Sequence, residues 1–94
     1  MKVGVYEHKA KKGVIRTTVK AYNDVVNIRI TGDFMVFPED VIFQLESRLS
    51  NIRPDPNLIS NIVDEVLSRA TLFGCTIDDF KTSIMGALRE VQLV

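Results

Sequence analysis

Few side chains of this chain are equipped for nucleophilic or acid–base chemistry near neutral pH, because it has one histidine, His8, and one cysteine, Cys75. A catalytic Cys–His pair would require two residues that are far apart in the sequence to meet in the fold. The pattern favours a simpler interpretation, in which His8 projects from a strand and Cys75 is a small apolar residue at a helix boundary. A zinc site or an iron–sulfur cluster needs several Cys or His ligands. We therefore expect no catalytic residue and no metal site in this chain.

A cluster of basic residues is the second group of side chains that could serve a chemical function. Lys9, Lys11 and Lys12 crowd a turn, and Arg16 follows in the next strand. These cations are candidates for contact with a phosphate or with a protein partner. The sequence contains neither a Gly-x-Gly-x-x-Gly pattern nor a Gly-Lys-Ser/Thr loop, so no known phosphate-binding pattern supports the first alternative. A solvated hairpin turn is the simpler explanation of the lysines.

An apolar run stands where a polar loop is expected, in the stretch RITGDFMVFPED at residues 29–40. Gly32 and Asp33 end a β-type pattern, and Phe34, Met35 and Phe37 follow before a proline. These five residues either form an interface with a partner or shape a loop that packs on the domain's own core. Asp33 either accepts backbone hydrogen bonds that shape the loop or faces a lysine of a partner.

The composition is that of one small globular domain, which we expect to span residues 1–94 with 46% hydrophobic and 26% charged residues. The formal net charge is zero, although Lys and Arg are concentrated in the first third while Asp and Glu dominate after residue 33. Zero net charge, few aromatic residues and the absence of a ribonucleoprotein motif argue against nucleic-acid binding. A single cysteine and the lack of a long apolar run predict a cytoplasmic protein without membrane association.

Three strands are predicted in the first third of the chain. Apolar and polar residues alternate over residues 14–22 and again over residues 26–32. The pair Asn23-Asp24 tolerates the positive φ angles of a tight turn, which predicts a hairpin. An upstream strand is predicted over residues 3–9, with Gly13 in the turn that follows it. The expected arrangement is a three-stranded antiparallel meander.

Three helices are predicted after residue 37, where the apolar spacing becomes helical. The first is expected to begin at Pro38 and to end near residue 51, and the second, capped by Asp55, to run from residue 56 to a stop at residue 74. The third is capped by Thr76 with Asp79 and runs to residue 91. Helix N-termini also explain the acidic pairs at 39–40 and 78–79. The expected fold is α+β, a three-stranded antiparallel sheet followed by three helices packed on one face (βββααα).

Several motifs occur in an order and spacing that resemble the accessory, C-terminal domain of lipoate-protein ligases. That family's pattern has a lysine, a turn with glycine, a strand beginning aliphatic-Arg, the run v.I.GDFf..P and a helix with LE..L. Here it is matched by Lys9, Gly13, Ile15-Arg16, Ile28 to Ile30, Gly32-Asp33-Phe34, Pro38, Leu45-Glu46 and Leu49. The later LFGCTIDDF also resembles the family, so the likeness spans roughly residues 8–90, with Met35 where a second Phe is common.

In fused enzymes of this family the accessory domain follows a large catalytic domain, whereas here it stands alone, as in ligases whose two parts are separate chains. The resemblance implies a non-catalytic accessory subunit, inactive alone, that binds a separate catalytic subunit and supports activation of lipoate by ATP to lipoyl-adenylate. The lipoyl group would then be attached to a lysine of lipoyl-domain E2 proteins or of the glycine-cleavage H protein. ATP, Mg and lipoate would be bound by the catalytic partner and none of them by this chain alone.

The alternative class is a free-standing sulfur-carrier or iron–sulfur-scaffold-like binding module, because the same fold family includes such proteins. Their chemistry requires a reactive cysteine on an exposed loop. Cys75, between Gly74 and a helix cap, is a poor substitute for that residue.

Overall fold

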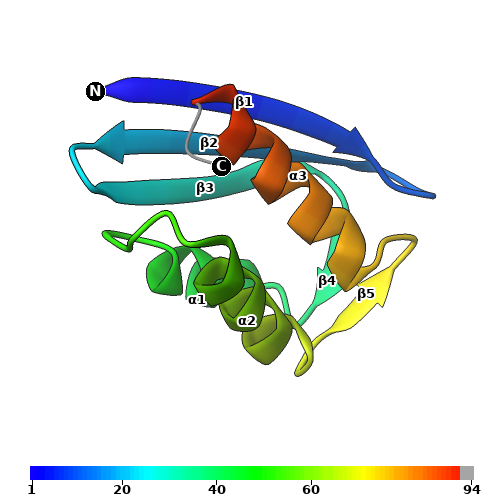
Figure 1. The fold of residues 1–94 in the computed structure, drawn as a ribbon. Coiled ribbons are helices and arrows are strands. Elements are labelled where there is room, and N and C mark those ends of the chain that lie inside the picture. Colours follow the sequence, from blue (N-terminus) through cyan, green and yellow to red (C-terminus); the bar gives the residue numbers. More distant parts are fainter. Residues whose placement is uncertain (92–94) are drawn as a thin grey trace.

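Three strands, a smaller pair of strands and three helices make up the computed structural model, which describes residues 1–91. The strands β1 (Lys2–Lys9), β2 (Val14–Tyr22) and β3 (Val25–Asp33) form an antiparallel sheet in the order β1-β2-β3. The helices follow in the sequence and gather on one side of this sheet (Figure 1). The predicted α+β fold, with its meander and its three helices, is confirmed.

Both predicted turns of the meander have the backbone that their residues favour. Asn23, in the β2–β3 turn, has a φ of 54°, which asparagine tolerates better than most side chains. Gly13, in the β1–β2 connection, has a φ of 114°, and its carbonyl accepts a hydrogen bond from the Ala10 amide at 3.0 Å. A Cβ on Gly13 would lie 2.1 Å from the Asp33 carbonyl oxygen, so only glycine fits between the strand ends.

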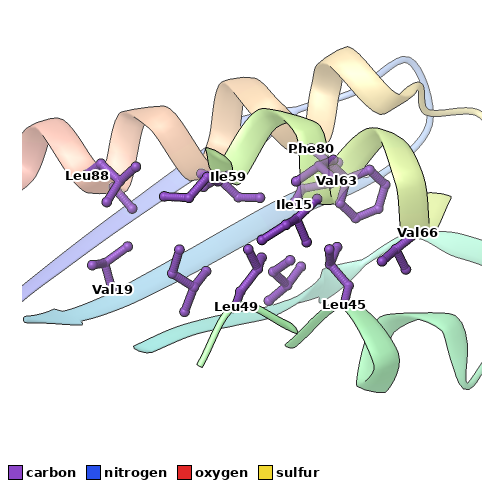
Figure 2. Packing of buried hydrophobic residues seen from close by; sticks show 14 of the residues in the cluster. Ile15, Val19, Leu45, Leu49, Ile59, Val63, Val66, Phe80 and Leu88 are labelled. Carbon is purple, nitrogen blue, oxygen red and sulfur yellow. The ribbon is translucent and has the colours of Figure 1, made fainter. Parts of the chain in front are cut away.

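The alternation of side chains gives the sheet one buried and one open face. On β2 the buried residues are Ile15, Thr17, Val19 and Ala21, and on β3 they are Val26, Ile28 and Ile30. They pack with residues of all three helices into one core, part of which is shown in Figure 2. Polar and charged side chains between them point away from the helices. We call that side of the three-stranded sheet the open face.

The first helix, α1 (Val41–Arg48), is shorter than predicted at both ends. Pro38 does not begin it, because β4 (Met35–Phe37) ends immediately before and residues 38–40 turn the chain, with the Val41 amide bonded to the Pro38 carbonyl. Consequently the acidic pair at 39–40 precedes the first helical turn, and Asp40 makes no side-chain cap. The prediction for this N-terminus was wrong because a strand uses the preceding residues.

The C-terminal end of α1 is set by β3, since the chain leaves the helix to cover the edge of that strand. Amides of Ile28 and Val26 donate to the carbonyls of Leu49 and Ile52 at 3.1 and 2.8 Å. The Ile30 amide donates to a Glu46 carboxylate oxygen at 2.8 Å. These bonds satisfy backbone groups that an uncovered edge strand would expose.

The second helix, α2 (Pro56–Leu67), begins as predicted but ends earlier. Asp55 caps it by accepting hydrogen bonds from two amides of the first turn, at 3.0 and 3.4 Å. The expected continuation to Gly74 is wrong, because β5 (Thr71–Phe73) pairs with β4 in a two-stranded antiparallel sheet that the sequence did not predict.

The third helix, α3 (Ile77–Glu90), has the predicted capping box. The Thr76 hydroxyl accepts from the Asp79 amide at 3.1 Å, and the Asp79 carboxylate accepts from the Thr76 amide at 2.9 Å. This helix packs on β1 and β2, where buried Ser83 bonds Thr17. Within residues 1–91, no helix has the length and apolar character needed to cross a membrane.

Candidate functional site

The apolar run after Asp33 consists of Phe34 and strand β4, and its side chains divide between the core and the surface. Phe34 is half-buried, with its ring centroid 5.2 Å from that of Phe80 in an edge-to-face arrangement. Val36 is buried, whereas Met35 and Phe37 are 64% and 66% exposed. Core packing therefore explains Phe34 but leaves Met35 and Phe37 without an internal role.

The exposed members of this run belong to a larger apolar surface. The register places Met35 directly opposite Phe73 of β5, which is 48% exposed, and Phe37 lies two residues along on the same face. Phe43 of α1 is 74% exposed and lines one groove together with Met35. We call Met35, Phe37, Phe43 and Phe73 the apolar patch. Exposed apolar surface of this kind commonly marks a protein interface.

Two members of the patch were not singled out from the sequence. Phe43 lies off the apolar stripe of α1, whose buried residues are Val41 and Leu45, and an aromatic residue on the polar side of a helix is a usable signal. Phe73 carried no such signal, because it fell in a segment expected to be helical. Only the pairing of β4 with β5 brings it to the surface beside Met35.

Part of the predicted site lines a hollow beside the apolar patch. It is lined by Lys12, Gly13, Asp33, Phe34, Met35, Leu72, Phe73 and Gly74. The Lys12 amide donates to the Gly74 carbonyl at 2.8 Å, which fixes the turn before β2 against the loop after β5. Among residues 1–91 the Asp33 carboxylate makes no hydrogen bond or ion pair in the structure, so Lys12 and Asp33 place one charge of each sign among the apolar residues and glycines that line this hollow.

The other predicted basic residues do not meet at this hollow. Lys9 and Arg16 lie on the open face, where Arg16 is 3.2 Å from the Glu7 carboxylate and about half of each of those two side chains is exposed. Lys11 is exposed in the turn before β2. Gly32 has a φ of 130°, and a Cβ there would lie 2.3 Å from the Val14 carbonyl oxygen. The fold itself therefore requires glycine at this position, and no contact with a partner is needed to explain it. The candidate basic cluster is thus divided between two surfaces.

Comparison with known proteins places this fold in one family. No protein-family model matches the chain. A curated relative, "Lipoate-protein ligase A subunit 2" of Thermoplasma acidophilum, is 52% identical over 42 residues, which are 44% of this chain and 45% of that protein. The match thus spans less than half of the relative's length.

The structural comparison extends over nearly all of the chain. A solved chain from "an archaeal lipoylation system", described as "a bi-partite lipoate protein ligase and its E2 lipoyl domain" from Thermoplasma acidophilum, superposes with a TM-score of 0.78. The two are 31% identical, and the superposition covers 87% of this chain and 93% of the solved one. This chain belongs to the family of accessory subunits of bipartite lipoate-protein ligases. The resemblance recognised in the sequence is confirmed.

The geometry of Cys75 in this ligase accessory subunit does not suit sulfur transfer. Its side chain is 7% exposed. Burial raises the pKa of the Cys75 thiol, and the negative charge of Asp79 raises it further. A buried, protonated thiol is a poor nucleophile, so the sulfur-carrier alternative gains no support from it.

His8 is likewise occupied by a structural contact. Its Nε2 donates to the Asp79 carboxylate at 2.8 Å, and this bond is the main cause of the lowered pKa of Asp79. In the part of the chain that the structure describes, no three His, Cys, Asp or Glu side chains gather closely enough to hold a metal ion. The surface features of this accessory subunit are therefore its strongest functional candidates.

Proposed function

We propose that this chain is the non-catalytic accessory subunit of a two-subunit lipoate-protein ligase. It binds a separate catalytic subunit and supports ATP-dependent activation of lipoate to lipoyl-adenylate, and the lipoyl group is then attached to a lysine of a lipoyl-domain E2 protein or of the H protein. The observation that carries this proposal is the structural likeness to the bipartite ligase system over 93% of the solved chain. Catalytic groups, ATP, Mg and lipoate belong to the catalytic subunit in this scheme.

The apolar patch is the surface proposed to bind the catalytic subunit. Permanent subunit interfaces have an apolar core and are enriched in aromatic residues and methionine, which matches the composition of this patch. Its three phenylalanines and one methionine are each between 48% and 74% exposed in the isolated chain. Lys12 and Asp33 at the neighbouring hollow would lie at the polar rim of the interface, where opposite charges of the partner set its orientation.

The function of such docking is indirect. Adenylate formation joins a carboxylate oxygen of lipoate to the α-phosphate of ATP and releases pyrophosphate, and transfer to lysine releases AMP. In our proposal the accessory subunit contributes binding free energy that holds the catalytic subunit in its adenylate-forming conformation. Removing it should therefore impair adenylate formation more than transfer from adenylate supplied ready-made.

The experiment that tests this proposal measures adenylate formation by the catalytic subunit of the same organism with and without this chain. We expect lipoyl-adenylate only when both chains are present and a stable complex at micromolar concentration. Full adenylate formation by the catalytic subunit alone would refute the supporting role, and a lack of association would refute the docking.

Single substitutions test the location of the interface. Phe37→Ser and Phe43→Ser should each weaken the complex by roughly tenfold or more, the effect of losing an aromatic anchor. Val3→Ser, at a 50% exposed residue of β1, the edge strand away from β3 and α1, is the control and should leave affinity unchanged. Equal losses in all three variants would place the interface elsewhere.

Asp33 is proposed to face a basic group of the catalytic subunit. Asp33→Ala should lower the rate of adenylate formation while transfer from ready-made lipoyl-adenylate is affected less. Asp24→Ala, which removes an exposed acid from the turn at the opposite end of β3, is the control. An equal loss in both half-reactions would remove the specific role of Asp33.

A further inference from the structure

Charge is segregated between the two layers of this protein. Residues 1–33, which contain the three-stranded sheet, carry seven Lys or Arg and three Asp or Glu. Residues 34–94 carry five Lys or Arg and nine Asp or Glu. A molecule without net charge thus has a basic sheet layer and an acidic helical layer, which is a dipolar arrangement suited to orienting a charged partner.

Four of the seven cations of this layer, Lys9, Arg16, Lys20 and Arg29, lie on the open face of the sheet, which also carries Glu7 and Asp33. In the strand register Thr18 pairs with Arg29 and Lys20 with Asn27, so Lys20 and Arg29 are diagonal neighbours on this face. Arg16 pairs with Thr31 and is the diagonal neighbour of Arg29 on the other side. Three cations therefore surround Thr18, and like charges at such positions repel one another.

The carboxylates near this cluster neutralise it only in part. Glu7 pairs with Arg16 at 3.2 Å. A Glu46 carboxylate oxygen lies 3.9 Å from Arg29 Nε. The same oxygen also accepts a hydrogen bond from the Ile30 amide at 2.8 Å. Asp33 stands in the row that also holds Lys9, away from Lys20 and Arg29. Within residues 1–91 no carboxylate lies within ion-pair distance of Lys20.

A hollow adjoins the basic cluster and connects it to the apolar patch. Lys20, Tyr22, Arg29 and Phe43 are among the residues that line it. Phe43 is also a member of the apolar patch, so the open face begins where the proposed interface with the catalytic subunit ends. A protein bound on the open face would lie next to the catalytic subunit.

We propose that the open face binds an acidic surface of the acceptor protein and thereby holds the lysine-bearing domain beside the catalytic subunit. The inference rests on the proposed function and adds a second partner to it. The open face presents these cations together with the exposed Val3 and Val5 of β1. Recognition led by charge suits an acceptor that must leave after each transfer, whereas the apolar patch suits a permanent partner. The expected recognition is between Lys20, Arg29 and Arg16 and carboxylates of the acceptor.

Acceptor kinetics test this inference with an unmodified lipoyl domain of the same organism as the probe. Lys20→Glu combined with Arg29→Glu should raise the apparent KM for this domain about tenfold, because electrostatic steering is reversed. The rate of adenylate formation, which involves no acceptor, should be unchanged. High salt should raise the KM of the unmodified complex and lower that of the variant, because it screens attraction in the first and repulsion in the second.

The matched control is Arg53→Glu combined with Arg89→Glu, which makes the same change in net charge at exposed positions outside the sheet. It should leave the KM for the lipoyl domain close to that of the unmodified complex. Thermal melting checks that both pairs of substitutions preserve the fold, which is expected because Arg29 is 72% exposed and Lys20 is exposed. If the reversed pair fails to fold, Lys20→Gln with Arg29→Gln should give a smaller rise in KM in the same direction.

Direct binding separates failure of this inference from failure of the proposed function. Titration of the isotope-labelled chain with the lipoyl domain should shift the amide signals of β2 and β3, and the Lys20→Glu, Arg29→Glu variant should abolish these shifts. Binding on this face without any effect of the chain on adenylate formation would leave the inference standing and overturn the proposed function. An unchanged KM together with unshifted β2 and β3 signals, or charge-reversal effects seen only on RNA binding or on self-association, would overturn the inference.

Discussion

His8 Nε2 lies 2.8 Å from Asp79 Oδ1, so one hydrogen bond joins the end of β1 to the first turn of α3. The other carboxylate oxygen of Asp79 accepts a hydrogen bond from the Thr76 amide at 2.9 Å. About a quarter of each side chain is exposed, 25% for His8 and 22% for Asp79, which leaves the pair partly shielded from solvent. A single carboxylate therefore holds a strand, a helix and the loop after β5 in place.

Asp79→Asn should destabilise the chain in a pH-dependent manner. The hydrogen bond from His8 lowers the folded-state pKa of Asp79, so its stabilising contribution is fully present above the unfolded pKa of about 3.9 and is lost as the pH falls through the folded pKa. At neutral pH we expect the free energy of unfolding to fall by about 1 kcal/mol, the usual value of a helix cap. Urea denaturation at several pH values should show this difference shrinking below about pH 4.

Asp78→Asn is the control for this measurement, because Asp78 is the exposed neighbour in the same helical turn and makes no hydrogen bond or ion pair among residues 1–91. Its effect should be smaller and should lack the same pH dependence. A difference between the unmodified chain and Asp79→Asn that stays constant at acid pH would rule out the carboxylate as its source.

The buried hydroxyl pair at the β2–α3 contact should behave as one unit. Ser83 Oγ and Thr17 Oγ1 are 2.8 Å apart, and the serine hydroxyl also lies 2.8 Å from the Ile15 carbonyl. Ser83→Ala removes a partner from buried polar groups and should cost about 1–3 kcal/mol. Combining it with Thr17→Val should cost less than the sum of the two single changes, as measured by a double-mutant cycle in urea. Simple additivity would show that the two hydroxyls act independently.

Local sequence patterns were sufficient to predict the three-stranded sheet and the first residues of two of the three helices. Alternation along β2 and β3, the turn at Asn23 and the capping box of Thr76 with Asp79 are all encoded by neighbouring residues, and each is present in the structure. These features depend on side-chain period and on hydrogen bonds within a few residues, which is the range over which a sequence can be interpreted directly.

The pairing of β4 with β5 could not be predicted in the same way. Met35 and Phe73 are cross-strand partners that are far apart in the sequence, and each strand has only three residues, too few to establish an alternating pattern. The segment after Leu67 has the apolar spacing of a helix, but it forms strand β5 because it pairs with the distant strand β4. The same tertiary contact creates the apolar patch, so the candidate site was only partly visible in the sequence.

Phe34 and Phe37 should separate core packing from partner binding. Phe34→Ala removes the ring that packs on Phe80 and should lower the free energy of unfolding by about 2–4 kcal/mol. Phe37→Ala changes a side chain that is 66% exposed and should alter stability by less than about 0.5 kcal/mol. Thermal melting of the isolated chain measures both effects. A large loss at Phe37 would assign that ring to the fold and remove it from the proposed interface.

Cys75 distinguishes a ligase subunit from a sulfur carrier. Because burial raises the pKa of its thiol and leaves the side chain 7% exposed, a thiol reagent at neutral pH should react slowly with the native chain and rapidly once the chain is unfolded in guanidinium. Cys75→Ala should therefore preserve the support of adenylate formation, with a modest loss of stability from the small cavity. A sulfur carrier would behave in the opposite way, with rapid modification of the native thiol and loss of function on substitution. Rapid native labelling together with an inactive alanine variant would thus exclude the accessory role and favour sulfur transfer.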